Sequence, residues 1–104
     1  MTGRVRFHPD ARAEFDADAD WYDARRPDLG DEFIDAVEAA VEDCAAHPAR
    51  WPLFPGVPAE LGVRRRVVQR FPYLVAYLAY DDGIVVVAVA HASRRPGYWR
   101  ARTG

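Results

Sequence analysis

Four side chains in the C-terminal half carry the groups that RNA cleavage by 2′-hydroxyl attack requires. That reaction needs a base for the hydroxyl, a cation for the developing charge on phosphorus and an acid for the leaving oxygen. His91, Arg66, Arg94 and Tyr98 could fill these roles without a metal ion. The alternative for His91 is structural, because no second histidine or carboxylate stands at ligand spacing from it. Its ring would then hydrogen-bond a neighbouring loop at the end of the last strand.

Arginine is the basic residue throughout, and its distribution divides the chain in two. Residues 1–60 hold 14 Asp and Glu against 6 Arg, whereas residues 61–104 hold 8 Arg against 2 Asp. The two parts therefore carry net charges of −8 and +6, and the second should bind an acidic protein segment, a carboxylate or a phosphate. The absence of lysine and the abundance of Ala, Arg, Asp and Val give an alternative for any single arginine, a compositional bias of the source genome.

The arginines of the second part lie in a predicted strand and in the tail. Side chains of residues 63–70 alternate, so Arg64, Arg66 and Arg70 are expected on one sheet face, with the acidic helices on the other face. The later strands offer almost no Asp or Glu to pair with them, which predicts a binding role for this face. The residues predicted to contact a partner or target are Arg64, Arg66, Arg70, Tyr73, Tyr77, Arg94, Arg95, Trp99 and Arg100.

The aromatic residues in this set also have a purely structural interpretation. Tyrosines on strands usually cover the sheet while their hydroxyl groups stay in water, and this would suffice for Tyr73 and Tyr77. Trp99 would likewise serve as a packing residue. Both alternatives are left open by the sequence.

The hydrophobic pattern predicts one α+β domain over residues 1–104. Residues 4–7 alternate as a short strand, an acidic helix begins after it at Pro9, and a second helix folds back antiparallel after a short connection at residues 27–30. Residues 63–71, 73–80 and 84–91 have strand composition, separated by turn signals. The order β-α-α-β-β-β predicts a two-helix hairpin packed on one face of a mainly antiparallel four-stranded sheet, with the opposite face open to a partner.

Composition excludes several classes of function. Cys44 is the only cysteine, so neither an intrachain disulfide nor a cysteine-based zinc site can form. A P-loop, a dinucleotide fingerprint and a His/Cys cluster are all missing, which predicts a protein without cofactor or metal. The longest apolar run, residues 84–90, is far too short for a bilayer. We therefore expect a cytoplasmic protein that has no membrane partner.

Two segments carry a specific resemblance. Residues 70–77, R-F-P-Y-L-V-A-Y, and residues 89–99, V-A-H-A-S-R-R-P-G-Y-W, combine with the helix hairpin and the arginine-rich strand into a pattern that resembles the RelE/ParE superfamily of bacterial toxins over nearly the whole chain. The resemblance implies a small α+β toxin in a toxin-antitoxin hetero-oligomer, neutralised by a cognate antitoxin that wraps around it. The proline-flanked loop, the F-P-Y turn and the Arg-Arg-Pro tail look more like the ParE-like, plasmid-stabilisation branch.

The superfamily that the chain resembles contains members with two different activities. RelE-type members cut ribosome-bound mRNA with basic residues and a C-terminal tyrosine, and His91 and Tyr98 lie roughly where such residues would fall. ParE-type members are not nucleases and poison DNA gyrase. The RelE-type lysines are missing here, arginine cannot act as a general base, and the sequence pI is about 5.9. The resemblance therefore favours growth arrest through gyrase, with a ribosome-dependent endonuclease and an inert antitoxin-binding relative as alternatives.

Overall fold

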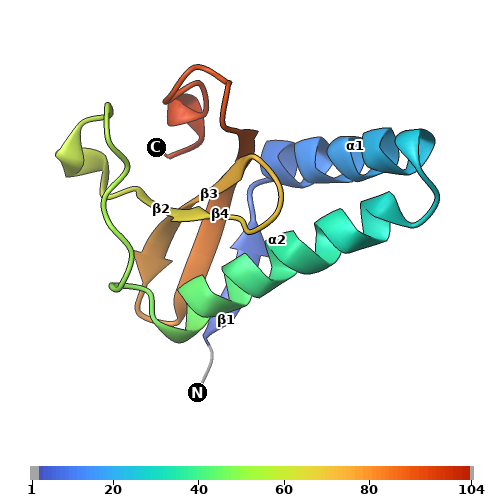
Figure 1. Ribbon diagram of the computed structural model, residues 1–104. Coiled ribbons are helices and arrows are strands. Elements are labelled where there is room, and N and C mark those ends of the chain that lie inside the picture. Colours follow the sequence, from blue (N-terminus) through green and yellow to red (C-terminus); the bar gives the residue numbers. More distant parts are fainter. Residues whose placement is uncertain (1–2, 104) are drawn as a thin grey trace.

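The computed structural model describes residues 3–103 and has the predicted order of elements, two helices between the first and second strands (Figure 1). Each strand and helix of the prediction is found, and two short 3₁₀ helices are added. The elements are β1 (Arg4–Phe7), α1 (Pro9–Arg25), α2 (Leu29–Ala46), η1 (Ala59–Leu61), β2 (Arg64–Val67), β3 (Tyr73–Tyr80), β4 (Gly83–His91) and η2 (Arg100–Arg102).

The helix hairpin is fixed by its ends. Pro9 occupies the first turn of α1, where its missing N–H costs nothing, and the Nδ1 atom of His8 accepts a hydrogen bond from the backbone N–H of Asp10 at 3.1 Å. The backbone N–H of Gly30 in α2 donates to the Asp23 carboxylate at 2.7 Å, which satisfies one of the free donors at the helix start. A side chain at position 30 would collide with the backbone of α1 at Ala19. Glycine therefore sets how closely the helices approach each other.

The four strands form one sheet in the order β1-β4-β3-β2. β2, β3 and β4 are antiparallel neighbours, whereas β1 pairs in parallel with β4, so the sheet is mixed. The helix hairpin between β1 and β2 provides the long connection that a parallel pair needs. β2 is shorter than the predicted strand over residues 63–71, because the chain turns after Val67 and Arg70 takes a positive φ of 72°.

Both faces of the sheet are covered, which corrects the expectation of an open face. On one face α1 and α2 bury a core that includes Phe15, Phe33 and Val75. On the other face the loop before β2 and the segment after β4 fold over the strands and bury Phe54, Val63, Ala76, Val87, Ala88, Ala90 and Trp99 (Figure 1). These segments lack a regular hydrophobic period, so alternation in the strands gave no sign that they would cover the sheet.

Candidate functional site at the C-terminal end of β4

Arg64 and Arg66 of β2 lie on the helix face of the sheet, not on the face away from it. The register pairs Arg64 with Tyr77 and Arg66 with Val75, and both partners belong to the core beneath the helices. Side chains that are paired across strands point to the same face. The predicted placement of the acidic helices opposite these arginines is therefore wrong, because alternation shows which residues share a face but not which face the helices cover.

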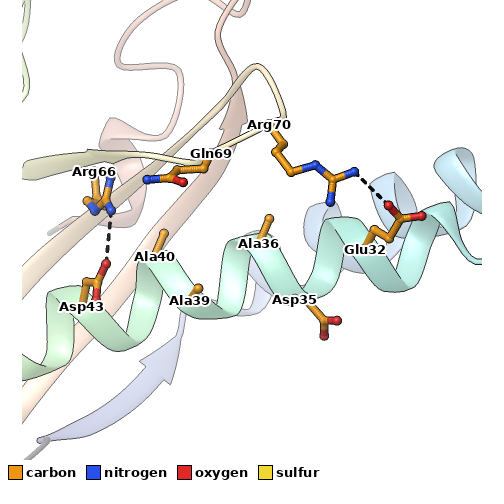
Figure 2. Close-up of a pocket in the computed structure, with 9 residues that line it drawn as sticks. All are labelled: Glu32, Asp35, Ala36, Ala39, Ala40, Asp43, Arg66, Gln69 and Arg70. Atoms are coloured by element: carbon orange, nitrogen blue, oxygen red, sulfur yellow. Dashed lines mark hydrogen bonds and ion pairs between the residues drawn. The ribbon is translucent and has the colours of Figure 1, made fainter.

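Helix α2 supplies the carboxylates that the strands lack (Figure 2). Arg66 donates through Nη2 to Asp43 at 3.1 Å, and Arg70 donates through Nη2 to Glu32 at 2.8 Å. Arg64 donates instead to the backbone carbonyl of Trp51 at 2.7 Å. A partner that binds these three arginines must compete with groups of the chain itself.

The two ion pairs stand over a groove of about 420 Å³ between α2 and the turn after β2, which we call the α2 groove. Alanines of α2 lie between the pairs (Figure 2). The side chain of Arg66 is only 18% exposed, and within residues 3–103 its buried Nε atom has no hydrogen-bond acceptor. Its guanidinium lies 4.4 Å from the ring centre of Trp51. Arg66 is thus held by its contacts with Trp51 and Asp43. It does not belong to the second hollow of the protein, which His91, Arg94 and Tyr98 line.

A second hollow, of about 170 Å³, lies on the other face at the end of β4, and we call it the basic hollow. Arg65, Arg94 and Arg95 line it together with apolar residues that include Leu74 and the buried Trp99. Within the described part of the chain, none of these three arginines forms an ion pair. An apolar surface framed by unpaired guanidinium groups is suited to binding a carboxylate or phosphate group.

His91 stands at the edge of the basic hollow with its Nδ1 atom occupied. The backbone N–H of Ser93 donates to Nδ1 at 3.0 Å, and the Ser93 hydroxyl lies 2.7 Å from the same atom. A backbone N–H can only donate, so Nδ1 carries no proton in this arrangement and the neutral ring carries its proton on Nε2. This is the loop hydrogen bond that we predicted as the structural role of His91. The ring then has no free basic nitrogen to accept a proton from a 2′-hydroxyl.

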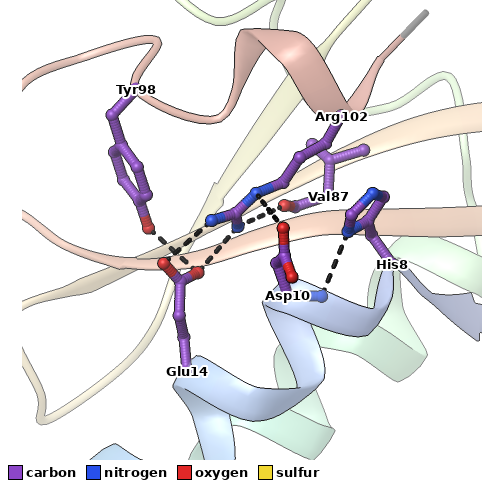
Figure 3. A network of polar contacts seen from close by, with 6 residues as sticks. All are labelled: His8, Asp10, Glu14, Val87, Tyr98 and Arg102. Carbon is purple, nitrogen blue, oxygen red and sulfur yellow. Dashed lines mark hydrogen bonds and ion pairs between the residues drawn. The ribbon is translucent and has the colours of Figure 1, made fainter.

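Tyr98 is held by a polar network that joins the C-terminal segment to α1 (Figure 3). Its hydroxyl donates to Glu14 at 3.3 Å, while Arg102 donates to the two carboxylate oxygens of Glu14 at 2.7 and 3.0 Å. Arg102 also donates to the carbonyl of Val87 at 3.1 Å. Burial raises the pKa of the Tyr98 hydroxyl, and the charge of Glu14 adds to this effect. Tyr98 is therefore disfavoured as a proton donor at neutral pH.

The pKa of the Glu14 carboxyl is shifted in the opposite direction. Burial acts to raise the pKa of its carboxyl, but the hydrogen bonds and charge of Arg102 outweigh burial and leave the pKa below its ordinary value. Glu14 therefore stays ionised and bound to Arg102. The network positions the C-terminal segment and leaves Glu14 unavailable as a base.

The remaining predicted contact residues divide by exposure. Tyr77 is fully buried and donates its hydroxyl proton to the carbonyl of Pro48 at 2.8 Å, so the expected water-facing hydroxyl is wrong for this residue. Trp99 is 1% exposed, as its packing interpretation predicted. Tyr73 is 6% exposed, and its ring packs nearly perpendicular to that of His91. Arg100 is exposed at the start of η2. Direct contact with a partner in this state is open to Arg100 but not to Tyr77.

Comparison with known proteins identifies the family of the chain and a solved structure with the same fold. Residues 5–96 match the family described as ParE toxin of type II toxin-antitoxin system, parDE. The chain belongs to the ParE toxin family. A solved structure of the chromosomal ParDE toxin-antitoxin system from P. aeruginosa has the same fold, with a TM-score of 0.72 and 18% identity over 86% of this chain and 96% of that chain. The comparison with curated proteins gave no match.

Family membership confirms the resemblance found in the sequence, and the fold of this ParE-family chain confirms the predicted β-α-α-β-β-β architecture. Two further structural findings complete the description. None of the helices formed by the described residues has both the length and the apolar character to cross a bilayer. Over residues 3–103, no three side chains of His, Cys, Asp or Glu gather as a metal site would require.

Sequence reasoning missed three residues around the site of this ParE-family chain. Arg65 is absent from the predicted contact residues, although it lines the basic hollow. The salt bridge between Glu14 and Arg102 joins residues 88 positions apart, and no local pattern signals it. The charge division between the two parts of the chain was the available signal, because it predicts pairing between α1 and the tail.

Proposed function

We propose that this ParE-family toxin arrests growth by inhibiting DNA gyrase and that a cognate antitoxin neutralises it. Family membership supports the toxin role directly. The observation that favours an inhibitor over a nuclease is the state of the candidate catalytic groups. His91 has its basic nitrogen occupied by Ser93, and Tyr98 is bound to Glu14. An inhibitor that binds its target needs no proton transfer, so it is compatible with both contacts.

The basic hollow is the surface that we propose for the target or the antitoxin. Arg65, Arg94 and Arg95 lie around an apolar patch and, unlike Arg66 and Arg70, form no ion pair with a carboxylate of residues 3–103. Charged hydrogen bonds contribute about 1.5–3 kcal/mol each when they are made in a desolvated interface. A partner with acidic side chains would gain these contacts without first breaking an ion pair.

Growth of a bacterial host tests the proposal. Induced expression of the chain alone should stop growth, and co-expression of the adjacent antitoxin gene should restore it. The triple variant Arg65→Gln, Arg94→Gln, Arg95→Gln should lose toxicity while it stays folded. The matched control is Arg4→Gln, Arg25→Gln, Arg50→Gln, which removes the same charge from exposed positions outside the hollow. Normal growth with soluble wild-type protein would leave only an inert antitoxin-binding relative.

A second function has one observation in its favour. His91, Arg94 and Tyr98 line the same hollow, as residues of a ribosome-dependent mRNA endonuclease would. If Ser93 releases the ring, His91 gains a basic nitrogen next to the guanidinium of Arg94. Under this alternative His91→Ala and Tyr98→Phe abolish toxicity, whereas gyrase inhibition requires neither proton transfer.

A further inference from the structure

A recurrent local arrangement in this protein combines one arginine, one carboxylate and one aromatic ring. At four places within residues 3–103 an arginine nitrogen lies 2.7–3.5 Å from a carboxylate oxygen while its Cζ lies 4.4–5.6 Å from a ring centre. Each guanidinium thus gains both an ion pair and a cation–π contact. The four sites are Arg12 with Asp16 and Phe15, Arg66 with Asp43 and Trp51, Arg70 with Glu32 and Phe71, and Arg102 with Glu14 and Tyr98.

One turn along α1 from Glu14, the carboxylate and the rings recur around a pocket of about 250 Å³. We call it the aromatic pocket, and it is lined by Asp18, Trp21, Tyr22, Tyr73 and His91. The rings follow one another in close contact: Trp21 meets Tyr22 at 5.1 Å, and Tyr73 meets His91 at 5.2 Å between ring centres. Residues 21 and 22 follow residue 18 by three and four positions, which places these three of the five residues on one side of α1.

Asp18 differs from the carboxylates of the four sites in forming no ion pair within the described part of the chain. Among residues 3–103 no ion pair involves Asp18, although it is half-buried. Burial raises the pKa of its carboxyl, and neither the hydrogen bond with Tyr73 nor the attraction of Arg94 and His91 offsets this effect. A cation placed against Asp18 would stabilise the ionised form that burial disfavours.

Trp21 gives a second, independent indication. Trp21 is 51% exposed, which is unusual for so large an aromatic residue, and the guanidinium of Arg25 already lies 4.2 Å from its ring centre. The exposed aromatic surface therefore attracts a guanidinium where one is within reach. Arg25 forms no part of the pocket lining, so the pocket side of the ring system stays available.

We propose that the aromatic pocket binds an arginine side chain of a partner polypeptide, with Asp18 as the ion-pair acceptor and the rings of Trp21, Tyr22 and Tyr73 as the walls. Charge complementarity selects this occupant, because an apolar side chain would bury the Asp18 carboxylate without supplying a cation. The planar guanidinium matches both the carboxylate and the rings, as it does at the four sites within the chain. The proposal does not depend on which cellular target the toxin inhibits.

NMR titration of the full-length protein tests the proposal. The probe is the peptide acetyl-Ala-Ala-Arg-Ala-Ala-amide, followed through the indole N–H signal of Trp21, which the variant Trp21→Phe assigns. The comparison peptide carries citrulline, which has nearly the same shape and no charge. The arginine peptide should give a saturable shift, and the citrulline peptide should bind at least about tenfold more weakly because it loses a charged hydrogen bond and the cation–π contact.

Two variants and one competitor complete the experiment. Asp18→Asn should lower the affinity for the arginine peptide by about tenfold or more. Asp20 is an exposed carboxylate on the same helix, so the control Asp20→Asn should change this affinity less than about twofold. Equal binding of the arginine and citrulline peptides, or unchanged binding to Asp18→Asn, would overturn the proposal. Tighter binding of free spermidine than of the peptide would overturn the assignment to a polypeptide.

Discussion

The salt bridge between Glu14 and Arg102 should be the strongest single tie between the C-terminal segment and α1. It contains two short hydrogen bonds, and the side chains are only 26% and 14% exposed. Removal of one partner from a fully buried pair costs about 3–5 kcal/mol. The partial exposure reduces this, so we expect Arg102→Gln to lower the free energy of unfolding by about 2–3 kcal/mol.

A double-mutant cycle isolates the interaction. Urea unfolding of wild type, Glu14→Gln, Arg102→Gln and the double variant should give a coupling energy of about 1–2 kcal/mol. The matched control is the pair Arg12 and Asp16 on the same helix, whose side chains are 54% and 63% exposed at 3.5 Å and which should give no more than about 0.5 kcal/mol. Equal coupling energies for the two pairs would refute the argument from burial.

The stability that the pair of Glu14 and Arg102 contributes should fall in acid. The pKa of Glu14 is below its ordinary value of 4.5 in the folded protein, because Arg102 outweighs burial. The stability from this pair is therefore fully present above about pH 4.5 and is lost as the pH falls through the folded value. The difference in unfolding free energy between wild type and Arg102→Gln should shrink in acid, and a difference that stays constant down to pH 2 would contradict the assignment.

Three further predictions concern single buried residues. Gly30→Ala should lower the free energy of unfolding by about 1–3 kcal/mol, measured in urea, because the new methyl group would lie 2.5 Å from the carbonyl oxygen of Ala19. Tyr77→Phe should cost about 1 kcal/mol in the same assay, since it leaves the carbonyl of Pro48 without its hydrogen bond. Burial raises the pKa of Cys44 to about 12, so a thiol reagent at pH 8 should modify it only after unfolding, and rapid labelling of the folded protein would contradict this.

The sequence was sufficient for the elements and for the family, and specific residues show why. Period and turn signals are local, so the helix beginning at Pro9 and the strand at residues 73–80 could be predicted from neighbours in the chain. The motifs around Phe71 and His91 carried the family resemblance that the family match over residues 5–96 confirms.

The faces of the sheet could not be predicted in the same way. Alternation groups Arg64 with Arg66, but only the register of β2 on β3 decides that both point toward α2. The cover of the other face depends on Phe54 and Trp99, which come from loops without a period and meet at 5.1 Å between ring centres. Contacts of this kind are set by the packing of distant segments, so the basic hollow and the aromatic pocket emerged only from the structure.

The most direct test of the central proposal is a pair of assays on one preparation of purified protein. We predict that the wild type inhibits DNA supercoiling by gyrase, that His91→Ala retains most of this inhibition, and that the triple variant of Arg65, Arg94 and Arg95 to glutamine loses it. Ribosome-bound mRNA should stay intact in all three cases. Codon-linked mRNA cuts by the wild type, lost in His91→Ala and accompanied by unchanged DNA supercoiling, would contradict the account.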